Sequence, residues 1–335
     1  MAASWMVSCA LMSAAFAATP AGAGTAPVTP MAQETQALKV AQVAQVAQAT
    51  QAALPTPAMQ RTQPAPAPAG RWTLMRPRPA PWADTTTTAG RDAAVARLSG
   101  AAVVFHADRV EGPSPLACAN ARYVFTAVPP EGLFQGSLPT PAARAAARLG
   151  LTAARLPTLR VECDTGVFDL HLSEPVRALF GLDGVVWTLR HDGPPDRSAL
   201  AAAQWLMLTH FAHDMAFTPA SVALKRRWLS PELARAIRAW QMRPAPADEP
   251  PAINGDPFTD TQEYPAAFRL GAPRRDGRVT VVPVLLEGPG LARRVDLRMS
   301  RIDLRWRLDD VVYEDGGTLR TLLAGDRAPA PGTRR

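Results

Sequence analysis

Residues 256–265 read DPFTDTQEYP, and this stretch decides how the second half of the chain is organised. It combines three carboxylates, one tyrosine and two prolines within ten residues. The flanking sequence has a helical pattern before it and a strand pattern after it. An Asp before a Pro favours extended backbone, and Asp side chains accept hydrogen bonds from nearby backbone N–H groups. We therefore expect Asp256 and Asp260 to organise the loop that joins helices to strands.

A calcium site is the alternative for this loop. Asp256, Asp260 and Glu263 offer the hard oxygen ligands that calcium prefers. Their spacing differs from that of an EF-hand, and the loop lacks the central glycine. We favour a structural role, in which Asp256 caps a turn and Asp260 caps a short helical turn through Glu263.

The pattern around this loop predicts an α+β domain over residues 198–324, with three helices packed on a curved four-stranded antiparallel sheet. The helices begin at Ser198, Thr218 and Ser230, because Ser and Thr are good N-cap residues and Pro is allowed at the first helical position. The expected strands and a final helical turn cover residues 268–270, 278–286, 293–299, 304–313 and 318–323.

Residues 71–192 predict a separate all-β domain, a small antiparallel sheet or barrel. Asp164-Thr165-Gly166 and Asp183-Gly184 are hairpin-type turns, and only residues 142–149 look helical. A break at Gly193-Pro194-Pro195 marks the expected boundary between the two domains. The strands are short β-branched or aromatic runs at residues 103–105, 122–125, 158–161, 167–172 and 185–189.

An apolar loop lies between two glycines at residues 131–136, EGLFQG. One hypothesis makes it an exposed tip on which a partner docks. The interpretation we favour is that it folds back onto the mouth of the β-rich domain.

The N-terminal sequence predicts that the protein is exported. Residues 1–17 combine a short apolar run with an A-x-A cleavage site, which is typical of a signal peptide. The run is too short to span a bilayer, so no transmembrane helix is expected in the mature chain. We expect a periplasmic or secreted protein; lipid anchoring at Cys9 is less favoured, because an eight-residue signal would be too short. Residues 18–70 and 325–335 predict a disordered Ala/Gln/Pro-rich tether and a disordered tail.

Cys118 and Cys163 remain after cleavage of the signal. An even pair of cysteines in an oxidising compartment predicts a disulfide. Two buried free thiols are the alternative.

The formal net charge of +7 comes almost wholly from arginine, since Lys39 and Lys225 are the only lysines. Basic and acidic residues are interspersed along the chain. A nucleic-acid surface would gather basic residues on one face, so we do not expect a nucleic-acid partner.

Four motifs in order indicate a relationship for the second half: WLSPEL (228–233), DPFTD (256–260), WRLDDVVY (306–313) and LRTLL (319–323). On these motifs, residues 198–324 resemble an uncharacterised family of bacterial envelope proteins and lipoproteins. That family is similar in fold to the nuclear-transport-factor-two-like, or cystatin-like, cone. The resemblance implies no established activity. The first half resembles no family.

Two further groups are candidates for chemistry. His210 and His213 lie one helical turn apart and could share a metal ion, but we favour two histidines that flank a buried stripe. Asp309 and Asp310 point to opposite faces of a strand, and the inward one could form an acid/base pair with Tyr264 or Tyr313. We favour an inward carboxylate that is satisfied by an arginine or by backbone N–H groups of the helical layer.

The sequence therefore predicts no catalytic residue, metal ion or cofactor; the candidates for binding or loop organisation are Asp256, Asp260, Tyr264, Asp309 and Asp310. The leading hypothesis is a non-enzymatic exported module that binds an unknown envelope protein or a small ligand. One alternative is a hydrolase or isomerase-type enzyme that uses the cone pocket. Another is an inhibitor or immunity-type protein that presents its 132–136 loop to a cell-wall hydrolase.

Overall fold

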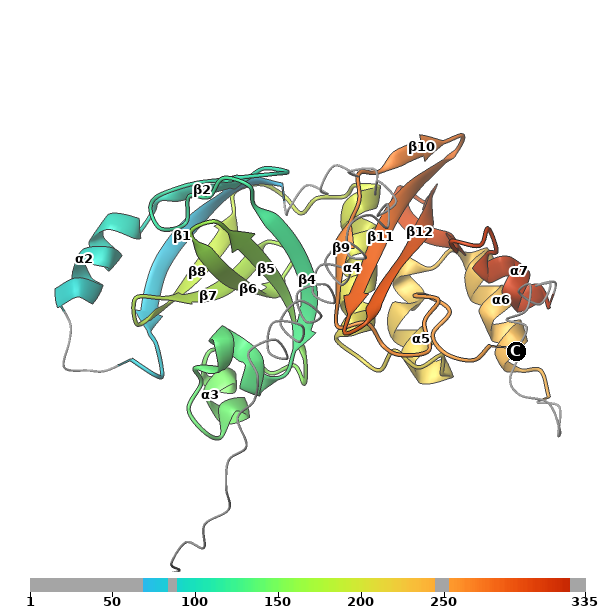
Figure 1. Cartoon of the computed structure of the whole chain (residues 1–335), viewed down its shortest axis with the longest axis horizontal. Helices are drawn as coiled ribbons and strands as arrows, with labels where there is room; N and C mark the ends of the chain where they lie inside the picture. Colours follow the sequence, from blue (N-terminus) through green and yellow to red (C-terminus); the bar gives the residue numbers. More distant parts are fainter. Residues whose placement is uncertain (1–68, 84–88, 245–252, 326–335) are drawn as a thin grey trace, which may run out of the picture. The chain divides into compact units, whose positions relative to one another are not determined.

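A computed structural model of the chain describes residues 69–83, 89–244 and 253–325 (Figure 1). The predicted signal peptide at 1–17, nearly all of the predicted tether at 18–70 and the predicted tail after residue 325 lie outside these residues. Among the helices in the described ranges, none is long and apolar enough to cross a bilayer.

The strands within the described residues form one antiparallel sheet of thirteen strands, in the order β13-β12-β11-β9-β4-β5-β6-β7-β8-β1-β2-β3, with β10 paired to β11. Their bounds are β1 Gly70–Pro79, β2 Ala102–Phe105, β3 Val110–Glu111, β4 Arg122–Val128, β5 Leu156–Cys163, β6 Gly166–Glu174, β7 Arg177–Leu182, β8 Val185–His191, β9 Ala267–Leu270, β10 Arg274–Asp276, β11 Val279–Gly288, β12 Leu291–Ile302 and β13 Arg305–Val312.

The prediction of an all-β domain followed by an α+β domain with its own four-stranded sheet is wrong. β4 and β9 pair, so the strands of both halves belong to the same sheet. At this seam Phe125 of β4 stacks on Phe268 of β9, with ring centroids 5.2 Å apart, and both rings are buried. Phe211 of helix α4 (Ala199–Phe211) packs on the same Phe268 ring, with ring centroids 4.9 Å apart. Buried aromatic surface therefore joins the two predicted units across the expected boundary.

The helix starts agree with the prediction. The hydroxyls of Ser198, Thr218 and Ser230 each accept a hydrogen bond from the backbone N–H three residues on, as N-caps do. The helices are α2 Ala89–Leu98, α3 Ala142–Arg148, α4 Ala199–Phe211, α5 Pro219–Lys225, α6 Pro231–Gln241 and α7 Leu319–Ala324, with 3-10 turns η1 Pro130–Gly136 and η2 Arg226–Trp228.

Helix α4 is buried on nearly all sides, because it contacts β4 and β5 as well as β11, β12 and β13. A helix that is apolar all round belongs inside a core rather than on one face of it. The larger core runs on both sides of the seam, from Trp72 to Leu323. A second, smaller core lies under η1 and α3 and includes Leu133, Phe134 and Leu179.

Three local predictions for the first half are confirmed, but the prediction that only residues 142–149 are helical is wrong, because α2 spans Ala89–Leu98. Cys118 and Cys163 form a disulfide, with Cα atoms 5.6 Å apart. Asp183 and Gly184 both have positive φ, which is the backbone of a two-residue type I′ hairpin turn. The 131–136 loop folds back, since Leu133 and Phe134 are buried.

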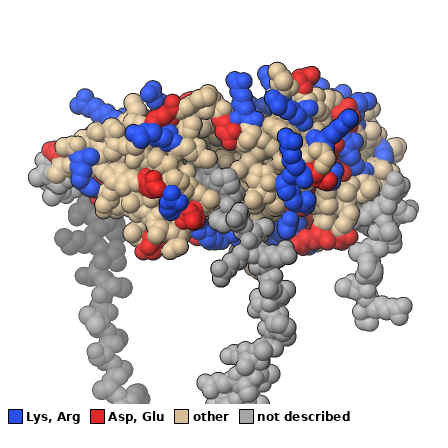
Figure 2. Space-filling view, turned by 90° about the horizontal axis from the view of Figure 1, so that it is seen from above, with Lys and Arg blue, Asp and Glu red and all other residues tan. Residues whose placement is uncertain are grey.

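Charged side chains of both signs lie side by side on the view in Figure 2, as expected from the interspersed sequence. Many form cross-strand ion pairs. Arg122 pairs with Glu162 and with Glu287, and Glu287 also pairs with Arg269, so this group crosses the β4–β9 seam. Such exposed pairs contribute about 0–1 kcal/mol each, less than the buried rings beneath them.

Because Phe268 is buried between β4 and α4, we expect Phe268→Ala to lower the free energy of unfolding by about 3–5 kcal/mol. The two halves share this contact, so tryptophan fluorescence and far-UV circular dichroism should still report one shared transition. Met242→Ala, at a side chain that is 77% exposed, is the control and should change little. Unfolding of the second half alone in Phe268→Ala would contradict the shared core.

Candidate functional site

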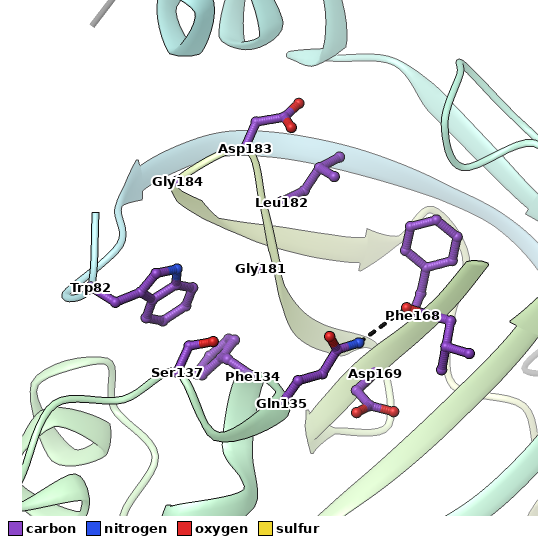
Figure 3. A pocket seen from close by; sticks show the side chains of 11 residues that line it. Trp82, Phe134, Gln135, Ser137, Phe168, Asp169, Gly181, Leu182, Asp183 and Gly184 are labelled. Carbon is purple, nitrogen blue, oxygen red and sulfur yellow. Dashed lines mark hydrogen bonds between the residues drawn. The ribbon is translucent and has the colours of Figure 1, made fainter. Parts of the chain in front are cut away.

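A cavity of about 170 Å³ opens between η1 and the β7–β8 hairpin, and we call it the turn pocket (Figure 3). Aromatic, carboxylate and amide side chains surround it. Its lining consists of Trp82, Phe134, Gln135, Ser137, Val167, Phe168, Asp169, Gly181, Leu182, Asp183 and Gly184.

The wall of the turn pocket on the η1 side has a left-handed backbone. Phe134, Gln135 and Gly136 have φ angles of 51°, 57° and 79° in succession. Only glycine adopts this conformation freely, and each other residue costs roughly 1–2 kcal/mol. Two consecutive side chains are therefore held in strained backbone at the edge of a cavity, which is where functional strain is often found.

A buried histidine holds this turn in place. The backbone N–H of Phe134 donates to Nε2 of His171 at 2.8 Å, and the two rings meet edge to face at 4.6 Å. On the other side, Nδ1 of His171 lies 3.0 Å from Oγ1 of Thr158, whose hydroxyl donates to the carbonyl of Leu156. Nε2 accepts and Nδ1 donates, so this chain of bonds requires a neutral imidazole. Burial lowers the pKa of His171 to about 4, opposed by the charge of Asp169.

The opposite wall depends on a glycine. The indole of Trp82 packs on Phe134 with ring centroids 5.1 Å apart and lies over Gly181. A Cβ on residue 181 would come within 2.9 Å of the indole. A larger residue at position 181 would displace Trp82, so Gly181 leaves the space that the indole needs beside strand β7.

The polar lining includes several acceptors. The amide nitrogen of Gln135 donates to the carbonyl of Val167 at 3.1 Å, which leaves its amide oxygen for other partners. Asp169 is buried and takes two hydrogen bonds from Arg160, at 2.9 and 3.1 Å. Asp183 is exposed at the tip of the β7–β8 hairpin. Aromatic side chains beside a few fixed polar groups are a combination that small-molecule sites use.

Asp256 makes several hydrogen bonds within and beyond its own loop. Its buried carboxylate accepts hydrogen bonds from Nε2 of His210 at 2.6 Å, from Oγ1 of Thr259 at 2.5 Å and from the backbone N–H of Phe258 at 3.0 Å. Nearby, the hydroxyl of Tyr313 donates to the carbonyl of Pro257 at 2.9 Å. The loop is thus tied to helix α4 and to the residue that follows β13.

A lysine is buried beside this network. The Nζ atom of Lys225 lies 5.4 Å from the centroid of the Phe258 ring. Burial lowers the pKa of Lys225 to about 8, against the charges of Asp256 and Asp214. Removing the Asp256 carboxylate would therefore leave a buried cation with less compensation.

Asp260 does not cap a helical turn as expected. It has a φ of 54° and lies 3.2 Å from Arg293 in a partly exposed ion pair. Asp256 and Asp260 are each engaged with protein groups, so neither offers a free carboxylate to calcium. Among the residues that the structure describes, no group of three or more His, Cys, Asp or Glu side chains could hold a metal ion.

The two histidines of helix α4 serve different surroundings. His210 is buried against Asp256, whereas His213 is exposed and bonds to the carbonyl of Thr209. This agrees with the structural role we favoured for them.

The paired carboxylates on β13 hold helix α7. Asp310 is buried and accepts from the backbone N–H groups of Val311 at 2.9 Å and Arg320 at 3.0 Å. Burial raises the pKa of Asp310, and these hydrogen bonds oppose the rise. Asp309 pairs with the Arg320 guanidinium at 2.6 Å. Tyr264 is half exposed, and the hydroxyl of Tyr313, the other tyrosine considered for an acid/base pair, donates to the carbonyl of Pro257.

Sequence reasoning missed the residues of the turn pocket apart from the 131–136 loop. Trp82 and Gly181 of the lining, and His171 behind it, lie far apart in sequence and carry no local motif. Two signals were present: the EGLFQG loop itself and the Asp183-Gly184 hairpin turn, which together form both edges of the cavity.

Comparisons with protein-family models, curated proteins and solved structures found no match for this chain. The resemblance of residues 198–324 to a family of envelope proteins therefore stays a prediction.

We expect the protein to become less stable as the pH falls, because His171 has a lower pKa in the folded than in the unfolded protein. The pKa of His171 is about 4 in the folded protein and about 6.5 when unfolded, so the unfolded chain binds more protons between these values. The contribution is complete above pH 6.5 and is lost as the pH falls to 4. When the pH is lowered from 7 to 5, the free energy of unfolding should fall by about 2 kcal/mol less in His171→Gln than in the parent protein. His213→Gln controls for removal of an exposed imidazole, and equal losses in the parent and His171→Gln would refute the effect.

Asp256 and Asp260 should differ in their effects on stability. Asp256→Ala removes the partner of a buried histidine and a charge that compensates the buried Lys225, so we expect it to cost about 3–5 kcal/mol in urea denaturation. Asp260→Ala should cost about 1 kcal/mol, because its ion pair is partly exposed and its φ is left-handed. Asp260→Asn tolerates that backbone and should cost less. A cost below 1 kcal/mol for Asp256→Ala would contradict the hypothesis that Asp256 organises this loop.

Proposed function

We propose that this protein is an exported, non-enzymatic binding module that holds a small ligand in the turn pocket. The observation that carries the proposal is the left-handed turn at Phe134 and Gln135, which lines a cavity. Strain of this kind persists only where surrounding contacts enforce it. Here the His171 bond, the Trp82 ring and the Gln135 amide bond all enforce it.

Export is part of this proposal. The disulfide between Cys118 and Cys163 supports it, because such crosslinks persist in oxidising compartments. The signal-like sequence at residues 1–17 supports it as well. We propose a periplasmic or secreted location.

The two alternative functions have less support. An enzyme in the second half would need a free inward carboxylate, and Asp310 is committed to the N-terminus of α7. An inhibitor would present the apolar side chains of the 132–136 loop, and Leu133 and Phe134 are buried.

The test is a fragment screen by NMR on the secreted protein, with Gln135→Gly as the variant. Glycine adopts the left-handed backbone freely, and this relief offsets the lost bond to Val167, so Gln135→Gly should stay within about 1 kcal/mol of the parent in stability. It should bind the pocket fragments at least tenfold more weakly. The control is Asp303→Gly, at another residue with positive φ (49°), and it should bind normally. Fragments that bind only elsewhere, or that bind Gln135→Gly as well as the parent, would refute the proposal.

A further inference from the structure

We propose, resting on the function proposed above, that the turn pocket selects a cationic group. This group is an ammonium or guanidinium, carried by a small molecule or by the side chain of a peptide. The inference comes from three properties of the lining: which hydrogen-bond groups are free, where the aromatic rings lie, and which charges are present.

Two lining residues, Gln135 and Asp169, offer free hydrogen-bond acceptors. One N–H of the Gln135 amide donates to the carbonyl of Val167, and the amide oxygen remains available (Figure 3). Arg160 occupies one position on each oxygen of Asp169, and a carboxylate has about four acceptor positions in total. A ligand group with several N–H donors would complement such a lining.

The charge of the lining is negative. Asp169 and Asp183 line the pocket, and no Lys or Arg does, although the chain carries 36 basic residues against 29 acidic ones. Arg160 neutralises Asp169 from outside the lining. Asp183 has no hydrogen bond or ion pair with any described residue, so its charge is available at the rim. A ligand anion would meet no cation among the lining residues.

Two partly exposed aromatic rings belong to the lining of the pocket. Figure 3 shows Trp82 and Phe168 on opposite sides of the pocket, with Gly181 between them. Both rings are partly exposed, whereas Phe134 is buried behind them. The faces of aromatic rings attract ammonium and guanidinium groups, and Trp does so most strongly. Acceptors and rings thus favour the same class of ligand.

A neutral polyol is the main competitor. It would also use the acceptors, but it would gain nothing from the negative charge of Asp183 in the lining. The cavity of about 170 Å³ admits one small group rather than a chain of sugar rings.

The experiment measures binding to the secreted protein by NMR and calorimetry, with probes of similar size and different charge. Butylamine and agmatine are the small cations, and an N-acetyl-lysine methylamide presents the same ammonium as a peptide side chain. Butyrate is the anion and 1,4-butanediol the neutral control. We expect the cations to shift the resonances of Trp82 and Gln135, more weakly at high salt, and the anion and the diol to bind at least tenfold more weakly. Tighter binding of the lysine probe than of butylamine would assign the source to a peptide; the reverse order would assign it to a small molecule.

Asp183→Asn supplies the matched test, because Asn tolerates the left-handed φ of 52° and only the charge is lost. We expect it to bind the cations about tenfold more weakly. Asp303→Asn makes the same change at a turn residue with a φ of 49° on another hairpin and should leave binding unchanged. Equal binding of the diol and the amines would overturn the cation preference while leaving a binding module. Amines that do not bind, or that bind Asp183→Asn as tightly as the parent, would overturn it too, and the fragment screen then decides the proposed function separately.

Discussion

The stack of Phe125 on Phe268 is the contact on which the arrangement of the chain depends. It lies where strands from the two halves pair, and helix α4 covers it through Phe211. The loop at 256–265 then fixes the approach to this seam, because Asp256 holds the loop against His210 of the same helix. A buried ring stack and a buried hydrogen-bond network therefore act on the same helix from two sides.

The turn pocket lies in the first half of the chain, beside the smaller core. There the polar bonds of His171 perform a task that apolar packing could not, since they select one backbone conformation for Phe134. A neutral histidine at this position is compatible with burial, and its two nitrogens bond to different partners. The position of the Gln135 amide follows from that conformation, so the chemistry of the cavity is set by a residue that does not line it.

The sequence was a good guide to local structure and a poor one to long-range pairing. The caps at Ser198, Thr218 and Ser230, the type I′ turn at Asp183 and the disulfide follow from neighbouring residues or simple counting. The joining of β4 to β9 was missed, because a strand edge has no sequence signature for its partner. Asp256 was recognised as an organiser from its own loop, but its bond to His210 was not. The cavity was missed because Trp82, Gly181 and Gln135 meet only in three dimensions.

The seam also has a consequence for the order in which the protein can form. Thr126 beside β9 bonds to the carbonyl of Ala266, a residue 140 positions later in the chain. While the ribosome is making the second half, the first half has no β9 to pair with, and the open edge of β4 exposes unpaired backbone groups. Such an edge is a template for pairing with other chains. Synthesis of this protein thus passes through a stage at which the completed first half is open to misassembly, until the last third of the chain has emerged.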